Sequence, residues 1–194
     1  MNECLLRFVN RVDAPTLNRI YEHYVTGTTV TFETIPPSDQ EFRERIECIS
    51  RDFPYLVCEI HGDVMGYAYA HRCFERAAYA WCVETSVYLK PEARRLGLGR
   101  RLFGALIDIL NIMNYKTLYA VIVSENVDSC VFHERMGFKR FSVFRNAGWK
   151  LGRWLDVSWY ELQFGNFDTP PLALRPISTI PPNVLNDIIQ KYNP

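Results

Sequence analysis

Two side chains that can move protons lie on either side of a glycine-bearing, arginine-rich stretch of this sequence. Glu84 precedes the stretch and His133 follows it. Reference pKa values of about 4.3 for glutamate and about 6.5 for histidine make Glu84 a candidate base and His133 a candidate acid near neutral pH. We expect burial among aromatic rings to raise the pKa of Glu84, which could also act through water. The rings expected around it are Tyr79, Trp81 and Phe32. A structural role stays open for both side chains.

The stretch between these residues joins the end of an apolar strand to the start of a helical pattern. Two glycines at i and i+2 let backbone N–H groups approach an anion, and the helix N-terminus adds partial positive charge. The pattern lacks the Lys-Ser or Lys-Thr of a P-loop and the third glycine of the dinucleotide fingerprint. We therefore expect a diphosphate site, with a strand-to-helix turn bearing solvated arginines as the alternative. Its residues are Arg94, Arg95, Leu96, Gly97, Leu98, Gly99 and Arg100.

Composition bounds the kind of protein. The chain has 194 residues, 48% of them hydrophobic, which suits one domain with a sizeable core. Its 22 basic and 22 acidic residues balance, so nucleic acid is not an expected partner. Six cysteines without a C-x-x-C pair favour a reducing compartment. No apolar run is long enough to span a membrane, and the N-terminus lacks a cleavage site for secretion. We expect a cytoplasmic protein without a membrane partner.

Periodicity and turn signals predict a mixed order of strands and helices. The expected strands are 4–9, 55–60, 64–71, 79–89, 117–123, 138–144 and 151–164, the last two joined around 146–148. The expected helices cover 15–25, a segment after a Ser38 cap, a segment after Gly99, and 126–136. An ordered loop is expected over 26–37. Residues 166–194 are proline-rich and predict a tail on the surface or on a partner subunit, with a short helix at 184–189.

This order of elements resembles the GNAT superfamily of acyl-CoA-dependent N-acyltransferases. The R-x-x-G-x-G pattern resembles its pyrophosphate loop. A second superfamily pattern, N-x-x-A-x-x-x-Y-x-x-x-G-F, is matched in spacing by Asn126, Ser129, His133, Gly137 and Phe138. The resemblance implies an α/β (α+β) GNAT fold, with a central mixed, mostly antiparallel sheet of six to seven strands and helices on both faces. We expect a GNAT domain over 1–165 and a C-terminal tail over 166–194.

A narrower resemblance is to the phosphinothricin and methionine sulfoximine (or sulfone) N-acetyltransferases. It covers residues 1 to about 165, and His133 belongs to this family's own pattern. The segments that carry it include I-Y-E-H-Y-V (20–25), T-F-E (31–33), V-E-T-S-V-Y (83–88), F-H-E (132–134) and K-L-G-R-W-L-D-V (150–157). The family implies acetyl-CoA as co-substrate, a small amine or amino acid as acceptor, a homodimer and no metal. Cys73-Phe74 departs from relatives that often carry tryptophan and a basic residue there, which puts the acceptor in doubt.

The resemblance and the chemistry of acetyl transfer together suggest roles for further residues. Val87, Tyr88 and Leu89 would offer backbone groups to the pantetheine arm. Asn126 and Ser129 would contact the cofactor from the following helix. Arg76 is the candidate for an acceptor carboxylate, although a surface role is nearly as plausible. The full set expected to bind the acceptor is Phe32, Glu33, Phe74, Glu75, Arg76, Glu84, Thr85 and Ser86. For Glu33, orienting the acceptor and plain solvation stay open.

The sequence thus predicts an acetyl-CoA-dependent N-acetyltransferase acting by direct transfer on the α-amino group of a small amino-acid-like substrate. Cys82 and Cys130 are the thiols nearest the motifs, but no base is spaced to activate either as a nucleophile. One alternative is an acetyltransferase for another amine, such as a polyamine, an aminoglycoside or a protein N-terminus. The other is a CoA-binding module without catalysis, which intact Glu84 and His133 argue against.

Overall fold

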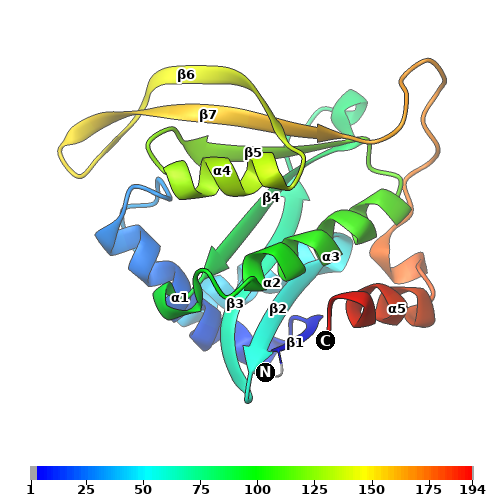
Figure 1. Cartoon of the computed structure of the whole chain (residues 1–194), viewed down its shortest axis with the longest axis horizontal. Helices are drawn as coiled ribbons and strands as arrows, with labels where there is room; N and C mark the ends of the chain where they lie inside the picture. The colour runs from blue at the N-terminus through cyan, green and yellow to red at the C-terminus, as the bar shows by residue number, and fades with distance from the viewer. Residues whose placement is uncertain (1–3, 194) are drawn as a thin grey trace.

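The computed structural model describes residues 4–193, which build a seven-stranded sheet with helices on both faces (Figure 1). The strands lie in the order β1-β2-β3-β4-β5-β7-β6, and β4 and β5 pair parallel while the other neighbours pair antiparallel. The strands are β1 (Cys4–Phe8), β2 (Tyr55–Ile60), β3 (Asp63–Arg72), β4 (Cys82–Leu89), β5 (Thr117–Val123), β6 (Lys139–Lys150) and β7 (Arg153–Gln163). The helices are α1 (Ala14–Gly27), α2 (Asp39–Asp52), α3 (Leu98–Ile112), α4 (Val127–Arg135) and α5 (Pro182–Tyr192). The predicted fold class is confirmed.

Two apolar clusters hold helices to the opposite faces of the sheet. Alternate residues of β2 and β3 point to opposite sides, because the side-chain period of a strand is two. Leu56 and Ala68 join the cluster under α3, whereas Val57 and Tyr67 join the cluster under α1 and α2. The second cluster is rich in tyrosine and forms one wall of the site described below.

The parallel contact between β4 and β5 is short. It joins Cys82–Glu84 to residues 117–119, and beyond it β4 continues along β3 while β5 continues along β7. Figure 1 shows β5, β7 and β6 running at a large angle to β2 and β3. Over residues 85–89, the edge of β4 that faces away from β3 has no strand partner in the described chain. A gap therefore opens in the middle of the sheet.

Two predicted boundaries were wrong. The strand expected at 79–89 begins at Cys82, because Ala77–Tyr79 form a short 3-10 turn. The last hairpin turns at Leu151 and Gly152, whose φ angles of 50° and 76° suit a tight turn with two left-handed residues. Asn146, at the centre of the predicted turn, instead lies in a β-bulge of β6 between Phe144 and Gly148.

The C-terminal segment packs on the chain's own core. Ile180 and Ile189 are buried in the cluster under α3, and the Asn193 side chain bonds the backbone of Leu6 in β1. The Lys191 ammonium bonds Asp108 of α3 at 2.7 Å. Helix α5 is longer than the predicted helix at 184–189. Packing within the chain thus accounts for Ile180 and Ile189, whereas Phe167 and Leu172 of the same segment are exposed.

Within the described part of the chain, every helix is either too short or too polar to cross a bilayer.

Candidate active site

A small cavity of about 50 Å³ lies in the gap between β4 and β5. It brings together predicted cofactor and acceptor residues from β4 with predicted residues from α4. Its lining residues are Val30, Thr85, Ser86, Val87, Tyr88, Ala120, Val121, Ile122, Asn126, Ser129 and His133. The Thr85 hydroxyl donates to the Tyr119 carbonyl at 2.9 Å across the point where the strands part. Residues from β4, β5 and α4 that are distant in sequence therefore share one cavity.

The glycine loop turns back into α3 through two left-handed residues. Arg95 has a φ of 65° and Gly97 a φ of 79°, and Leu98 begins the helix. Gly97 is the N-cap and has no side chain to accept from the first helical N–H groups, which have no intrahelical acceptor. Arg95 and Arg100 are exposed beside them. The loop thus combines open donors, positive charge and a helix N-terminus, the features that bind phosphate.

Helix α1 anchors the start of this loop. The Arg94 guanidinium lies 5.6 Å from the centre of the Tyr24 ring, and its Nη2 donates to the Tyr24 hydroxyl at 3.3 Å. That hydroxyl in turn donates to the carbonyl oxygen of Leu89 at the end of β4. Arg94 therefore has a packing role within the protein in addition to the predicted role in anion binding.

The first turn of α4 faces the same gap. Asn126 is its N-cap, and its Oδ1 accepts from the Ser129 N–H at 3.3 Å, which leaves its amide NH₂ group available to a ligand. One turn further on, the Nδ1 of His133 lies 2.8 Å from the Ser129 carbonyl oxygen. Because a carbonyl only accepts, Nδ1 carries the proton and donates this bond.

His133 is buried in an apolar environment. The centres of the Phe103, Phe132 and Phe138 rings lie 5.0, 5.1 and 5.4 Å from the imidazole, each roughly edge to face. Burial lowers the pKa of His133 to about 4. The expectation that it carries a proton near neutral pH is therefore wrong. Its Nε2 is buried without a hydrogen-bond partner in the described chain and presents a lone pair.

Glu84 lies on the other face of β4 from the apolar cluster under α3. Its Oε1 is 3.8 Å from Nε2 of His71, the residue directly opposite on β3. Burial raises the pKa of Glu84, and the charge of His71 partly offsets that rise. Tyr69 and Cys73 are close enough to be affected by the carboxylate charge. The expected direction of the pKa shift is confirmed.

The aromatic rings expected around Glu84 make other contacts. The indole N–H of Trp81 donates to the Leu172 carbonyl at 2.8 Å, and the Tyr79 ring packs on Phe74 at 4.7 Å. The Phe32 ring lies against Gly148 of β6.

Glu33 is bonded within the protein. Its Oε1 accepts from Arg45 of α2 at 2.7 Å and from the Tyr21 hydroxyl at 2.9 Å. These bonds hold the loop after α1 against α1 and α2. Plain solvation, one of the two interpretations of Glu33, therefore does not describe this carboxylate, which is bonded to α1 and α2.

The three neighbouring residues predicted to bind the acceptor, Phe74, Glu75 and Arg76, differ in their surroundings. Phe74 stacks parallel to Trp159 and also contacts Tyr119, the β5 residue opposite Glu84, so its ring belongs to this side of the sheet. Glu75 is 93% exposed at its side chain, and Arg76 is exposed and lines neither of the two cavities described here.

Three polar residues at this site were not among the predicted site residues. His71 faces Glu84, Arg45 binds Glu33, and the Nζ of Lys150 donates to the Thr31 carbonyl at 2.7 Å. An alignment of the predicted hairpins could have paired His71 with Glu84. Tertiary packing brings Arg45 to Glu33 and Lys150 to Thr31.

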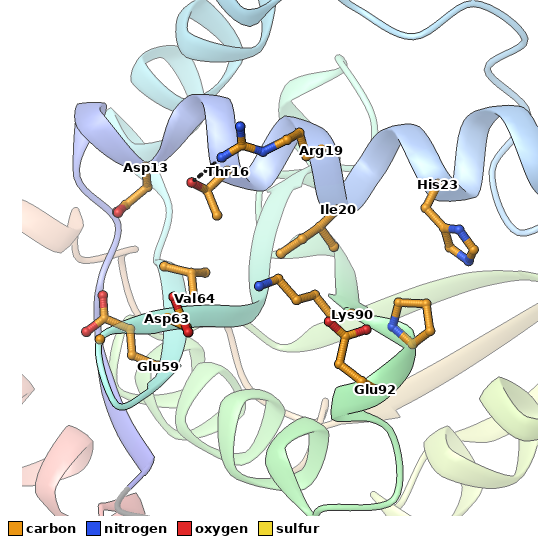
Figure 2. A pocket seen from close by; sticks show the side chains of 12 residues that line it. Asp13, Thr16, Arg19, Ile20, His23, Glu59, Asp63, Val64, Lys90 and Glu92 are labelled. Atoms are coloured by element: carbon orange, nitrogen blue, oxygen red, sulfur yellow. Dashed lines mark hydrogen bonds between the residues drawn. The ribbon is translucent and has the colours of Figure 1, made fainter.

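A larger cavity of about 540 Å³ lies elsewhere, between α1, the β2–β3 turn and the segment after β4 (Figure 2). Its lining is strongly charged, with Arg19, Lys90 and Glu92 among the labelled side chains. Asp13 and Glu59 in this lining are already paired with Arg7. The larger cavity contains no predicted site residue. The small cavity between β4 and β5 is therefore the better candidate for the active site, although it is the smaller of the two. Among residues 4–193, no group of three or more metal-ligating side chains is suitably placed for an ion.

Comparisons with known proteins agree with this geometry. The family model described as an acetyltransferase (GNAT) domain matches residues 6–159. A phosphinothricin N-acetyltransferase of Streptomyces viridochromogenes is 35% identical over 90% of this chain and 95% of its own. An L-methionine sulfoximine/L-methionine sulfone acetyltransferase of Salmonella typhimurium is 30% identical over 85% of this chain and 97% of its own.

A solved structure resembles this chain in both sequence and fold. A GNAT superfamily phosphinothricin acetyltransferase from Sinorhizobium meliloti, in complex with acetyl-CoA, superposes with a TM-score of 0.84 at 33% identity and covers 88% of this chain and 94% of its own. The gapped sheet and these matches define an N-acetyltransferase. The chain belongs to the GNAT acetyltransferase family.

The first prediction concerns the glycine loop. Replacing the exposed Arg95 and Arg100 together by glutamate should weaken CoA binding by about 10²-fold or more, because charge-assisted bonds to phosphate are lost and repulsion is added. Calorimetric titration with CoA measures the change. The matched control reverses Arg51 and Arg145, which are exposed outside the loop. Equal CoA affinity in both folded variants would remove the diphosphate from this loop.

The second prediction concerns the pKa of His133. Between about pH 4 and 6.5 the unfolded chain binds a proton at this residue that the folded chain does not, so its contribution to stability falls as pH falls through this window. The stability difference between wild type and His133→Gln should therefore grow from pH 4 to 6.5 and level off above about pH 7. Urea unfolding at each pH measures it, with the exposed His23→Gln as control. A difference independent of pH would contradict the lowered pKa.

Proposed function

We propose that this protein transfers the acetyl group of acetyl-CoA directly to the α-amino group of a small amino-acid-like substrate of the phosphinothricin, methionine sulfoximine or methionine sulfone type. The observation that carries the proposal is the gap between β4 and β5, which has a phosphate-type loop at one end and Glu84 and His133 beside it. Family membership and the names of the relatives support the class of acceptor.

The residues present suit acetyl-CoA. The open donors at Gly97 and the arginines beside it match a diphosphate, and the free edge of β4 over 85–89 can pair with the amides of a pantetheine arm as an added strand. Asn126 keeps its amide donors, and His133 keeps an acceptor, at the cavity wall. Acetyl-CoA supplies the acetyl group as a thioester.

Amide formation removes two protons from the acceptor's ammonium group, and the side chains can receive them separately. We assign the first proton to Glu84, directly or through water, because its raised pKa makes it a stronger base than an exposed glutamate. The second must reach the sulfur that leaves. The neutral Nε2 of His133 can accept that proton and then give it up, so His133 acts as a shuttle rather than as a pre-charged acid.

Direct transfer agrees with the state of the nearby thiols. Burial raises the pKa of Cys82, and it raises the pKa of Cys73 to about 12. Both are therefore protonated near neutral pH, and a protonated thiol is a poor nucleophile. The acceptor amine is the better candidate to attack the thioester.

The acceptor side is aromatic and charged. Phe74 and Trp159 offer a stacked apolar surface next to Tyr119 and Glu84, and Arg76 remains the candidate for the acceptor's carboxylate.

The third prediction tests this function with an amine panel. Phosphinothricin and methionine sulfone should release thiol from acetyl-CoA faster than a polyamine or an acceptor whose carboxylate is masked. Glu84→Gln and His133→Gln should each lower the rate by about 10²-fold or more, as loss of acid–base catalysis does, with CoA affinity little changed. Glu44→Gln, an exposed change on α2, is the control. Preference for a polyamine or for the masked acid would reject the amino-acid acceptor.

We also propose that the protein is a homodimer. The support on this molecule is the long outer strand β6, where Phe141, Phe144 and Trp149 are more than half exposed. The Phe141 and Phe144 rings both lie beside the Trp159 ring, at 6.4 and 5.4 Å between ring centres, and exposed apolar patches of this kind mark association surfaces.

The fourth prediction follows from this surface. Light scattering at micromolar concentration should return twice the chain mass of 22.7 kDa. Phe141→Glu with Phe144→Glu should reduce the mass to that of one chain, because buried charges disfavour the interface. Exposed Phe167→Glu is the control. A wild-type mass of one chain would refute the dimer.

A further inference from the structure

Lys150, the last residue of β6, is buried although lysines are usually exposed. Its relative exposure is 4%. Its Nζ donates to the carbonyl oxygen of Thr31 at 2.7 Å and lies 3.4 Å from that of Tyr24, and within the described chain it forms no ion pair. Burying an ammonium group is costly unless its donors are satisfied. The buried ammonium group of Lys150 therefore binds the backbone carbonyls of Thr31 and Tyr24.

The backbone that Lys150 holds belongs to one wall of the site. We call residues 28–33 the wall segment. Val30 of this segment lines the cavity beside β4. The Thr31 hydroxyl lies 2.8 Å from the Tyr21 hydroxyl, which also bonds Glu33. Any shift of the Thr31 backbone therefore moves both the cavity wall and the Glu33 carboxylate.

Two further contacts join the same segment to the β6–β7 hairpin and its neighbour. A Cβ atom on Gly148 would lie 2.2 Å from a ring atom of Phe32, so the absence of a side chain there allows the ring to pack on β6. The Thr29 hydroxyl bonds Glu125 at 2.8 Å, and Glu125 pairs with Arg153 of β7 at 2.5 Å. Figure 1 shows the turn of this hairpin beside the chain that follows α1.

We propose that Lys150 is a positioning residue for the acceptor: it fixes the wall segment to the β6–β7 hairpin so that Phe32 and Glu33 face the acceptor in one arrangement. The proposal rests on the proposed function, because the acceptor side of the gap is defined there. Lys150 does not touch the reacting atoms and acts through the Thr31 backbone. Its loss should affect the use of acceptor more than the binding of CoA, because the glycine loop at the start of α3 binds the diphosphate and the wall segment lines the cavity through Val30 alone.

The test compares Lys150→Met with wild type. Methionine keeps most of the apolar stem and removes the donors. The kcat/KM for the acceptor should fall by about 10²-fold, the size of effect that displacement by about 1 Å produces, while the Kd for CoA stays within about two-fold. Amide hydrogen exchange of the peptide containing residues 28–33 should become faster. Lys139→Met, at the exposed opposite end of the same strand, should change none of these quantities.

Two outcomes separate this proposal from the function on which it rests. If wild type acetylates none of the amines, the proposed function fails, and the exchange rate of residues 28–33 still decides the role of Lys150. Unchanged exchange and unchanged kcat/KM in a folded Lys150→Met variant would overturn it. If that variant does not fold, Gly148→Ala displaces the half-exposed Phe32 ring instead, and an unchanged KM for the acceptor would then overturn it.

Discussion

The rest of this structure depends on the early separation of β4 from β5. Three residues of β4 pair with β5, and the following residues pair on the β3 side alone. Backbone groups in the middle of a sheet need partners, so a free inner edge is costly unless a ligand or water completes it. The apolar cluster under α3 contains residues from both halves of the sheet, including Leu56 of β2 and Leu118 of β5, and so fixes their arrangement on either side of the gap. Because the free edge of β4 needs hydrogen-bond partners, the gap is a place where an extended ligand can bind as an added strand.

Desolvation then sets the electrostatic character of that place. It raises the pKa of Glu84 and lowers the pKa of His133, so both groups shift toward their uncharged forms. The two shifts have one cause and complementary effects. A glutamate with a raised pKa is a better base for an ammonium, and a neutral histidine offers a lone pair at Nε2. Three phenylalanine rings around His133 make this possible, because they exclude water without supplying a competing donor.

Local patterns in the sequence predicted most of the fold and the parts of the site that depend on short spacings. Gly97 needs a left-handed φ, and Asn126 caps a helix that carries His133, so each is recognisable from its neighbours. The turn at Leu151 and Gly152 was missed because the Asn-Ala-Gly sequence at 146–148 is an equally good turn signal and forms a bulge instead. The protonation of His133 was missed because burial is a tertiary property, and the reference pKa of a histidine carries no information about it.

Long-range polar contacts explain why the acceptor side was harder to predict than the cofactor side. The diphosphate loop is one continuous segment, whereas the proposed acceptor side joins the wall segment to α1, α2 and β6. Lys150 meets Thr31 across 119 residues of sequence, and Arg45 meets Glu33 from the next helix. Such contacts depend on the register of β6, which the bulge between Phe144 and Gly148 shifts by two residues relative to β7, so that Lys150 pairs with Arg153 at the end of the hairpin. The same bulge that misled the turn prediction therefore sets the position along β6 of the lysine that we propose supports the acceptor wall.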